Sequence, residues 1–210
     1  MFKGDFQMNK FIAIVGSNAD KSTNRTLLQF IKRHFADQAE IELVEIKDLP
    51  VFAKNSERTI PLYATQLANK IAESDGVIIS TPEYDHSVPA ALLNALAWLS
   101  YGVHPFVNKP VMITGASYGS LGSSRAQAHL RQVLDSPELM ARVMPSSEYL
   151  LGHSLEAFDD EGNLKDPEKV KLLEGLFADF EAFVRITAQL NNTQTQDEAI
   201  ANDFSWEENK

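Results

Sequence analysis

The stretch that decides the fold is Gly76-Val77-Ile78-Ile79-Ser80, followed directly by Thr81-Pro82-Glu83-Tyr84-Asp85-His86-Ser87-Val88-Pro89. The first part is an apolar, β-branched run that ends in a turn residue, which is typical of a buried strand in a parallel sheet. The loop after it stays outside the sheet, because Pro82 and Pro89 have no N–H group to donate to a strand ladder. Ligands of open α/β sheets bind at the carboxyl ends of the strands, so we expect this loop to line a binding site. The alternative is an ordinary connector between a strand and a helix.

Strand-like runs alternate with helical patterns along the rest of the chain. Strands are predicted over residues 11–15, 41–46, 76–80 and 111–114, with a fifth inside 143–151. Helices are predicted over residues 26–36, 61–74, 89–100, 126–134 and 166–190. This alternation predicts an α/β fold, a doubly wound five-stranded parallel sheet with helices on both faces. Right-handed crossovers favour the strand order 2-1-3-4-5.

In that order, the loops after strands one, three and four share one edge of the sheet. They cover residues 16–24, 81–87 and 115–124, and they have the most unusual composition in the chain. The first loop leads into a helix, so its backbone N–H groups form a ready anion site. Its side chains Ser17, Ser22, Thr23 and Asn24 offer short polar groups that suit phosphate oxygens.

Two other interpretations of the first loop bear on this prediction. Ser22 or Asn24 could serve only as the N-cap of the helix that follows, which is compatible with a phosphate site. The loop matches neither G-x-G-x-x-G nor G-x-x-x-x-G-K-[ST], which disfavours a Rossmann dinucleotide site and a Walker P-loop.

The composition narrows the classes of function. The formal net charge is −10 and no segment gathers a basic stripe, which argues against a nucleic-acid partner. No apolar run approaches the ~18 residues of a membrane span. The absence of cysteine removes disulfides, thiolate metal ligands and cysteine nucleophiles, and it fits a cytoplasmic location. The five histidines are scattered without ligand spacing, so no metal site is predicted.

Three blocks of sequence resemble those of a known family. Gly16-Ser17 with Ser22-Thr23-Asn24 is similar to the G-S-x-R-x-x-S-x-N phosphate loop of the NADPH-dependent FMN reductase family, a flavodoxin-like group of flavin, quinone, azo-dye and chromate reductases. Residues 81–89 resemble its T-P-E-Y-N-x-S-x-P loop, and residues 115–122 resemble its G-A-S-x-G-x-x-G block. The resemblance spans roughly residues 10–190 in the right order and spacing.

The resemblance implies an FMN-dependent NAD(P)H oxidoreductase that reduces quinones, flavins or similar small acceptors in a ping-pong cycle. Since the flavin supplies the redox chemistry, no side chain is assigned as catalytic. Two positions depart from the family pattern. Ala19 replaces the arginine, so Lys21, or Arg25 as a further candidate, is expected to supply the cation, and Asp85 replaces the asparagine. The implied cofactor-binding residues are Ser17, Lys21, Ser22, Thr23, Asn24, Pro82, Glu83, Tyr84, Asp85, Ser117 and Gly119.

Other classes of function remain open at this stage. One alternative is a flavodoxin-type electron carrier or a flavin-binding regulatory module without nicotinamide turnover. The phosphate loop favours the enzyme, because carrier flavodoxins typically have a T/S-x-T-G-x-T loop that this chain lacks. Another alternative is a scaffold that has lost FMN through Ala19.

The sequence also predicts the organisation of the chain. Residues 1–190 are expected to form a single flavodoxin-like, FMN-binding domain, and residues 191–210 an acidic C-terminal tail. The helix over 89–100 is apolar around more of its circumference than one sheet face requires. This surplus apolar surface predicts a homodimer, or a tetramer built from dimers. The other expected partner is the small-molecule electron acceptor. No nucleic-acid or membrane partner is expected.

Overall fold

A computed structural model of the chain describes residues 8–54, 57 and 59–190, so the predicted acidic tail lies outside the described residues. The sheet contains β1 (Asn9–Val15), β2 (Ala39–Val44), β3 (Gly76–Ser80), β4 (Pro110–Ala116), β5 (Arg142–Val143) and β6 (Tyr149–Leu151). The helices are α1 (Thr23–His34), α2 (Leu62–Glu73), α3 (Ala90–Trp98), α4 (Ser124–Leu134) and α5 (Pro167–Ala188). All strand pairs are parallel, and their order β2-β1-β3-β4-β5 confirms the predicted topology.

Strand β3 lies at the centre of the sheet. Its Ile78 is in register with Ala13 of β1 and Met112 of β4. All five residues of β3 are buried, as its continuous apolar run predicts for a strand covered on both faces. The chain leaves the sheet directly after Ser80, so the loop that begins with Thr81 lies at the carboxyl edge.

The fifth strand position is divided between β5 and β6, which both pair with β4. The interruption between them contains Pro145, which has no N–H group, and Ser146, whose φ is 54°. The carbonyl groups of Met144 and Ser147 in this segment accept hydrogen bonds from the guanidinium of Arg131 instead of from a strand. The sheet therefore has six strands rather than the predicted five, with two short ones in the last position.

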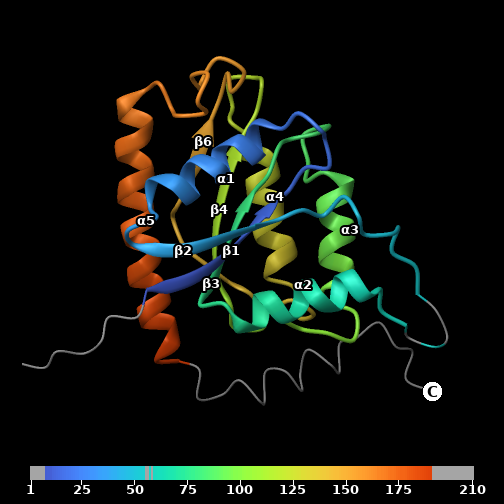
Figure 1. Cartoon of the computed structure of the whole chain (residues 1–210). Helices are drawn as coiled ribbons and strands as arrows, with labels where there is room; N and C mark the ends of the chain where they lie inside the picture. The colour runs from blue at the N-terminus through green and yellow to red at the C-terminus, as the bar shows by residue number, and fades with distance from the viewer. Residues whose placement is uncertain (1–7, 55–56, 58, 191–210) are drawn as a thin grey trace, which may run out of the picture.

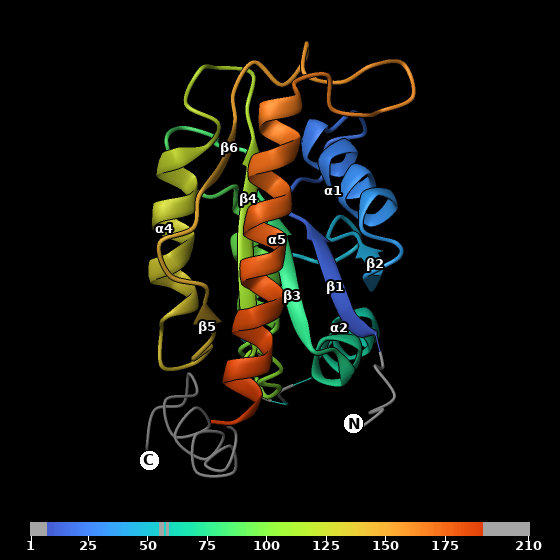
Figure 2. The same cartoon turned by 90° about the vertical axis from the view of Figure 1, so that its left-hand side faces the viewer.

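Helices cover both faces of the sheet (Figure 1). Helices α1 and α5 pack on one face, where the stacked rings of Phe35 and Phe177 lie 3.8 Å apart between centroids. Figure 2 shows α5 lying along this face with α1 beside it. Helices α2, α3 and α4 pack on the other face. The arrangement leaves the carboxyl edge of the sheet to the loops.

The apolar surface of α3 is largely covered within the chain. Trp98 donates its indole N–H to the carbonyl of Pro50 at 2.8 Å, and its ring lies 4.9 Å from that of Phe52. Leu92, Leu96 and Leu99 are buried as well. Most of the apolar surface from which a subunit interface was predicted is therefore used by the segment before α2 and by the core.

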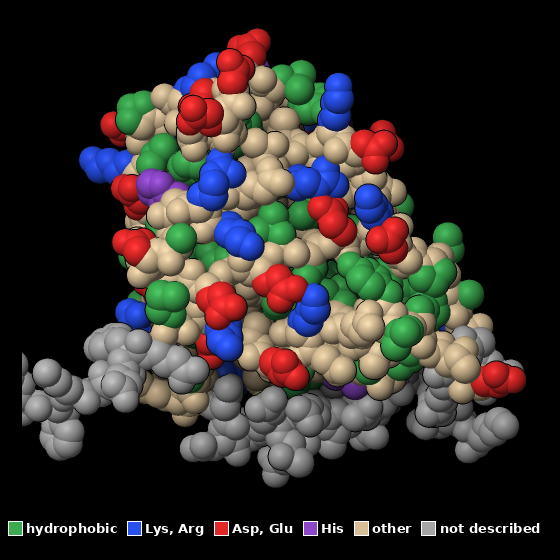
Figure 3. Space-filling model, in the orientation of Figure 1, with side chains coloured by type: hydrophobic (Ala, Val, Ile, Leu, Met, Phe, Trp, Pro, Cys, Tyr) green, Lys and Arg blue, Asp and Glu red, His purple; other side chains and the backbone are tan. Residues whose placement is uncertain are grey.

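The charged surface is mixed. In the view of Figure 3, acidic and basic side chains are interspersed, and the basic ones form no continuous stripe on this face. Within the described ranges, neither α5, the longest helix, nor any shorter one has the length and apolar content that a membrane crossing requires. The described part of the chain also has no cluster of three or more potential metal ligands among its His, Asp and Glu side chains.

Candidate functional site

The loops after β1, β3 and β4 meet around a cavity of about 440 Å³ at the carboxyl edge of the sheet. This volume lies within the range of small-molecule sites. Every residue of the predicted cofactor set except Asp85 lines the cavity. The sequence prediction did not include six further lining residues, which are His86, Ala116, Tyr118, Ser120, Leu121 and Arg125.

The loop before α1 surrounds the N-terminal end of that helix with polar groups. Ser22 is the N-cap, and its hydroxyl accepts a hydrogen bond from the backbone N–H of Arg25 at 3.3 Å. The hydroxyl of Ser17 accepts from the N–H of Ala19 at 3.2 Å, and that of Thr23 lies 2.9 Å from Ser154 Oγ. Backbone N–H groups and hydroxyls thus surround the helix N-terminus, the arrangement that binds phosphate.

Lys21 is the cation at this end of the cavity, and no described carboxylate forms an ion pair with it. The alternative cation from the sequence, Arg25, does not line the cavity. Its guanidinium forms two hydrogen bonds with the carboxylate of Glu45, at 2.6 and 3.0 Å. Lys21 is therefore the side chain that can pair with a bound anion here.

Asn24 connects three elements of the fold. Its side-chain oxygen accepts hydrogen bonds from the N–H of Ala116 at 2.9 Å and from the hydroxyl of Ser80 at 2.8 Å. Its side-chain nitrogen donates to the carbonyl of Ala116 at 2.8 Å. Asn24 is almost completely buried, with 2% of its surface exposed. Its amide thus joins the start of α1 to the ends of β3 and β4, and it leaves at most one N–H for a ligand.

The second loop makes a sharp two-residue turn. Tyr84 and Ser87 exchange backbone hydrogen bonds of 3.2 and 2.9 Å, and the two residues between them have positive φ, 49° for Asp85 and 61° for His86. Two consecutive positive φ angles define a type I′ turn, which favours Asn, Asp and Gly. Asp85 fits this turn and is exposed, but of the two turn residues only His86 lines the cavity.

Glu83 links the second loop to the third. Its carboxylate accepts hydrogen bonds from the backbone N–H groups of Arg125 and Ala126 and from the guanidinium of Arg125, at 2.9, 3.3 and 3.2 Å. These N–H groups belong to the first turn of α4, whose N-cap Ser123 makes no side-chain capping bond. Glu83 therefore caps α4 from another loop, and its charge complements the helix dipole.

The third loop is fixed by the segment after β6. Ser117 donates its N–H to Leu151 and accepts from Ser154, both at 3.0 Å, and the carbonyl of Gly119 accepts from His153 at 3.0 Å. Tyr118 and Leu121 are exposed on the same loop, and Tyr84 is exposed across the cavity. The cavity is thus lined both by hydroxyls at the start of α1 and by aromatic side chains, and the hydroxyl of Tyr84 lies 3.5 Å from that of Ser17.

This combination fits FMN. The N–H groups and hydroxyls at the start of α1 and the ammonium of Lys21 suit a phosphate, and Pro82, the aromatic side chains and the loop backbone suit a flat ring. A Cβ placed on Gly119 would meet no atom within 4 Å, so the third loop leaves open space at this point.

The comparisons with known proteins agree with the site. The family model described as NADPH-dependent FMN reductase matches residues 9–156. NADH:(hydroxy)cinnamate reductase subunit CrdA of Vibrio ruber is 54% identical over 185 residues, which cover 88% of this chain and 92% of that one. NADH-dependent flavin reductase subunit 2 of Lactobacillus johnsonii is 45% identical over 182 residues, with coverage of 83% and 97%.

A solved structure is similar as well. FerB, a flavoenzyme NAD(P)H:(acceptor) oxidoreductase from Paracoccus denitrificans, matches with a TM-score of 0.74 and 28% identity over 87% of this chain and 98% of that one. These matches confirm the predicted oxidoreductase and its use of FMN and NAD(P)H, rather than the alternative of an electron carrier. The chain belongs to the NADPH-dependent FMN reductase family.

Proposed function

We propose that this chain holds FMN in the cavity of about 440 Å³, takes reducing equivalents from NADH and delivers them to a quinone, a free flavin or a similar flat acceptor. The observation that carries the proposal is the convergence of three loops on one cavity, which is lined by the start of α1, by Lys21 and by aromatic side chains. The choice of NADH is supported by the names of the two similar relatives, which are both NADH-dependent.

The residues divide into three roles in this proposal. Ser17, Lys21, Ser22, Thr23 and the first N–H groups of α1 bind the phosphate. Pro82, Tyr84, Ser117 and Gly119 lie along the ring system and orient it. Asn24 and Glu83 hold the three loops together, as their contacts described above indicate. FMN, when bound, would supply the redox chemistry between the nicotinamide and the acceptor. The protein contributes binding and orientation, and no side chain is assigned to acid or base catalysis.

The experiment that tests the proposal has two parts. The purified chain should bind one FMN, identified by the mass of the released cofactor, and it should oxidise NADH faster than NADPH when a benzoquinone is added. Release of FAD, or the absence of flavin binding, would contradict the cofactor assignment. Flavin binding without nicotinamide oxidation would instead point to an electron carrier.

Replacing Lys21 with methionine tests the phosphate end. We expect the Kd for FMN to rise by about tenfold, because a charge-assisted contact to the phosphate contributes about 1.5–3 kcal/mol when it is desolvated. The Kd for riboflavin, which has no phosphate, should not change. Lys32→Met, on an exposed position of the last turn of α1, is the matched control. Equal losses for both flavins would show that Lys21 does not contact the phosphate.

We also propose that the chain assembles as a homodimer through the groove between α3 and α4. The groove has a volume of about 310 Å³. The α3 residues Leu93 and Ala97 are only half-buried there. Its apolar lining consists of Leu93, Leu96, Ala97, Val133 and Leu139.

An arginine in this groove should separate the subunits. For Ala97→Arg we expect the mass measured by light scattering at micromolar concentration to fall from dimer to monomer, because a guanidinium would be buried against apolar side chains. Asp37→Arg, on an exposed position after α1, is the control and should remain dimeric. A wild-type protein of monomer mass with full quinone reductase activity would remove the proposed interface.

A cytoplasmic location completes the proposal. It is supported by the cysteine-free sequence and by the use of a reduced nicotinamide. Cell fractionation of the native protein is the direct measurement, and recovery in a secreted fraction would contradict it.

A further inference from the structure

Arg25 occupies a position that local helix physics disfavours. It is the third residue of α1, and the first turn of this helix contains no acidic residue. A cation in the first turn faces the positive end of the helix dipole, where an anion would be stabilising. Ser22, Thr23 and Asn24, which precede it, follow the usual preferences for a helix start. A locally unfavourable residue beside a binding loop indicates a function that offsets its cost.

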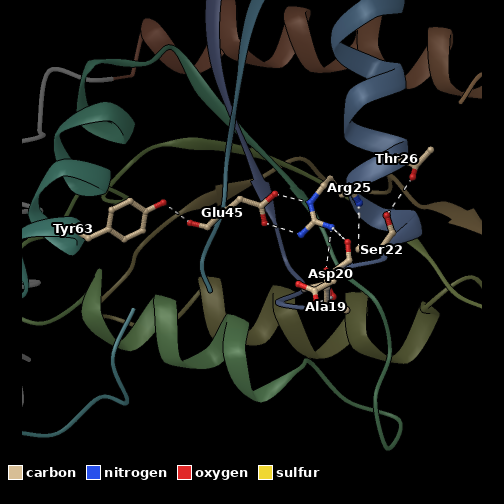
Figure 4. A network of polar contacts seen from close by, with 8 residues as sticks. Ala19, Asp20, Ser22, Arg25, Thr26, Glu45 and Tyr63 are labelled. Carbon is tan, nitrogen blue, oxygen red and sulfur yellow. Dashed lines mark hydrogen bonds and ion pairs between the residues drawn. The ribbon is translucent and has the colours of Figure 1, made fainter. Parts of the chain in front are cut away.

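The contacts of Arg25 explain this position. Its Nη1 donates to the carbonyl groups of Ala19 and Asp20, at 3.0 Å each. Its Nε and Nη2 form a bidentate pair with the carboxylate of Glu45, at 2.6 and 3.0 Å. Arg25 does not line the cavity. Its guanidinium instead holds the backbone carbonyls of residues 19 and 20 in the phosphate loop, as Figure 4 shows.

Glu45, the partner of Arg25, is itself held in place by the fold. It follows directly after β2, and its backbone carbonyl accepts a hydrogen bond from the hydroxyl of Tyr63 on α2 at 2.7 Å (Figure 4). The Arg25 and Glu45 side chains are 19% and 31% exposed, so solvent screens the pair only in part. Glu45 also brings a negative charge to the helix end and offsets the charge of Arg25 there. The loop is thus tied to two other elements of the fold.

We propose that Arg25 and Glu45 act as a positioning pair, which fixes the backbone of residues 19–20 so that the loop N–H groups and Lys21 are preset for the FMN phosphate. This inference rests on the proposed FMN site. The pair also accounts for the alanine at position 19, where the family pattern has an arginine. The Ala19 side chain carries no charge, but Arg25 holds the backbone carbonyl of Ala19 from α1. Arg25 is a positioning residue and not a phosphate ligand.

The rival interpretation is that Glu45 pairs with the Arg25 guanidinium only while the site is empty, and that a bound phosphate replaces Glu45 as the partner of Arg25. The two ideas give opposite signs for one substitution. If Arg25 positions the loop, Glu45→Gln weakens its anchor and FMN binds less tightly. If Arg25 is a ligand held away from the cavity, Glu45→Gln releases it and FMN binds more tightly.

The experiment titrates the FMN-free protein with FMN and with riboflavin, following the quenching of flavin fluorescence. For Arg25→Met we expect the Kd for FMN to rise about tenfold or more, because at least two charge-assisted hydrogen bonds that fix the loop are lost. The Kd for riboflavin should change little, so the ratio of the two affinities falls. For Glu45→Gln the Kd for FMN should rise about two- to fivefold, since a neutral acceptor replaces a charged one.

Arg25→Lys tests whether the forked shape of the guanidinium is required or only its positive charge. A single ammonium cannot replace a fork that pairs with a carboxylate and two carbonyl groups, so lysine should restore little of the FMN affinity. Lys70→Met is the matched control, because Lys70 forms another ion pair with a glutamate of β2, at 2.6 Å to Glu42, away from the cavity. Its affinities for both flavins should equal those of the wild type.

Several outcomes would overturn the inference. They are tighter FMN binding by Glu45→Gln, full rescue by lysine, or equal losses for FMN and riboflavin in Arg25→Met. If Arg25→Met does not fold, as thermal unfolding would reveal, Arg25→Lys and Glu45→Gln carry the test. A wild-type chain that binds no FMN would refute the proposed function itself, which is a different result from FMN binding that is insensitive to Arg25.

Discussion

Replacing Asn24 with alanine should lower the free energy of unfolding by about 3–5 kcal/mol, and FMN should no longer be retained. The substitution leaves the N–H and carbonyl of Ala116 and the hydroxyl of Ser80 without their partner, in a place where Asn24 is 2% exposed. A buried polar group without a partner costs about 1–3 kcal/mol. The loops at the ends of β3 and β4 would also lose their connection to α1. Urea unfolding and FMN fluorescence measure the two effects.

A control variant and a second substitution at position 24 test the reason for this loss of stability. Asn69→Ala, at an exposed position inside α2, should change the stability by no more than about 0.5 kcal/mol. Asn24→Asp keeps the oxygen that accepts both hydrogen bonds, but it directs a second, buried carboxylate oxygen at the carbonyl of Ala116, so it should also be strongly destabilised. An Asn24→Ala protein with wild-type stability and weaker FMN binding would mean that its amide serves the ligand rather than the fold.

Replacing Gly115 with alanine should cost about 3 kcal/mol or more of stability, at the upper end of what overpacking produces. A Cβ at this position would lie 2.6 Å from the carbonyl oxygen of Thr81 and would overlap the hydroxyl of Ser123. The serine side chain can rotate, but the Thr81 backbone is held by its N–H bond to Thr114 at 3.0 Å. The methyl group would therefore push apart the second and third loops of the site. Thermal unfolding of the FMN-free protein is the measurement.

Gly175→Ala is the matched control and should have the opposite sign. Gly175 lies inside α5, and a Cβ there would meet no atom within 4 Å. Alanine in a helix interior is more stable than glycine by roughly 0.5–1 kcal/mol, so this variant should melt at a higher temperature. If both substitutions proved harmless, the loops at the carboxyl edge would be able to move apart freely, and the cavity would be less preformed than described above.

Features that depend on local sequence could be predicted well. The apolar run over residues 76–80 gives β3 its bounds, and the alternation of strand and helix patterns gives the sheet order. The α1 helix begins three residues before the predicted Thr26, because Ser22 is its N-cap, one of the two capping residues considered from the sequence. The three loops were found because position in the topology, rather than any single residue, brings them together.

Features that depend on partners far apart in the chain could not be predicted. Nothing near Glu83 in sequence shows that its carboxylate caps α4, and nothing near Arg25 shows that Glu45 pairs with it. The apolar circumference of α3 suggested a subunit interface, whereas Phe52 and its neighbours cover much of it. Asp85 stands where the family pattern has an asparagine, and it was included in the predicted cofactor set, but it does not line the cavity. The sequence allows several partners for each of these groups, and the tertiary fold determines which partner each one meets.

The two outer strands determine how copies of this protein can meet. On one side, β2 alternates buried residues with the exposed, charged side chains of Glu40 and Glu42, of which Glu42 pairs with Lys70, and charged side chains disfavour pairing with the same strand of a second copy. On the other side, β5 and β6 have only two and three residues and are separated by a bend, so they offer no long template of free backbone groups. Exposed sheet edges are the usual starting points of fibrous aggregation, and short or charged edges block it. Crowded solutions of this protein should therefore resist strand-by-strand polymerisation, and association is left to the helical faces.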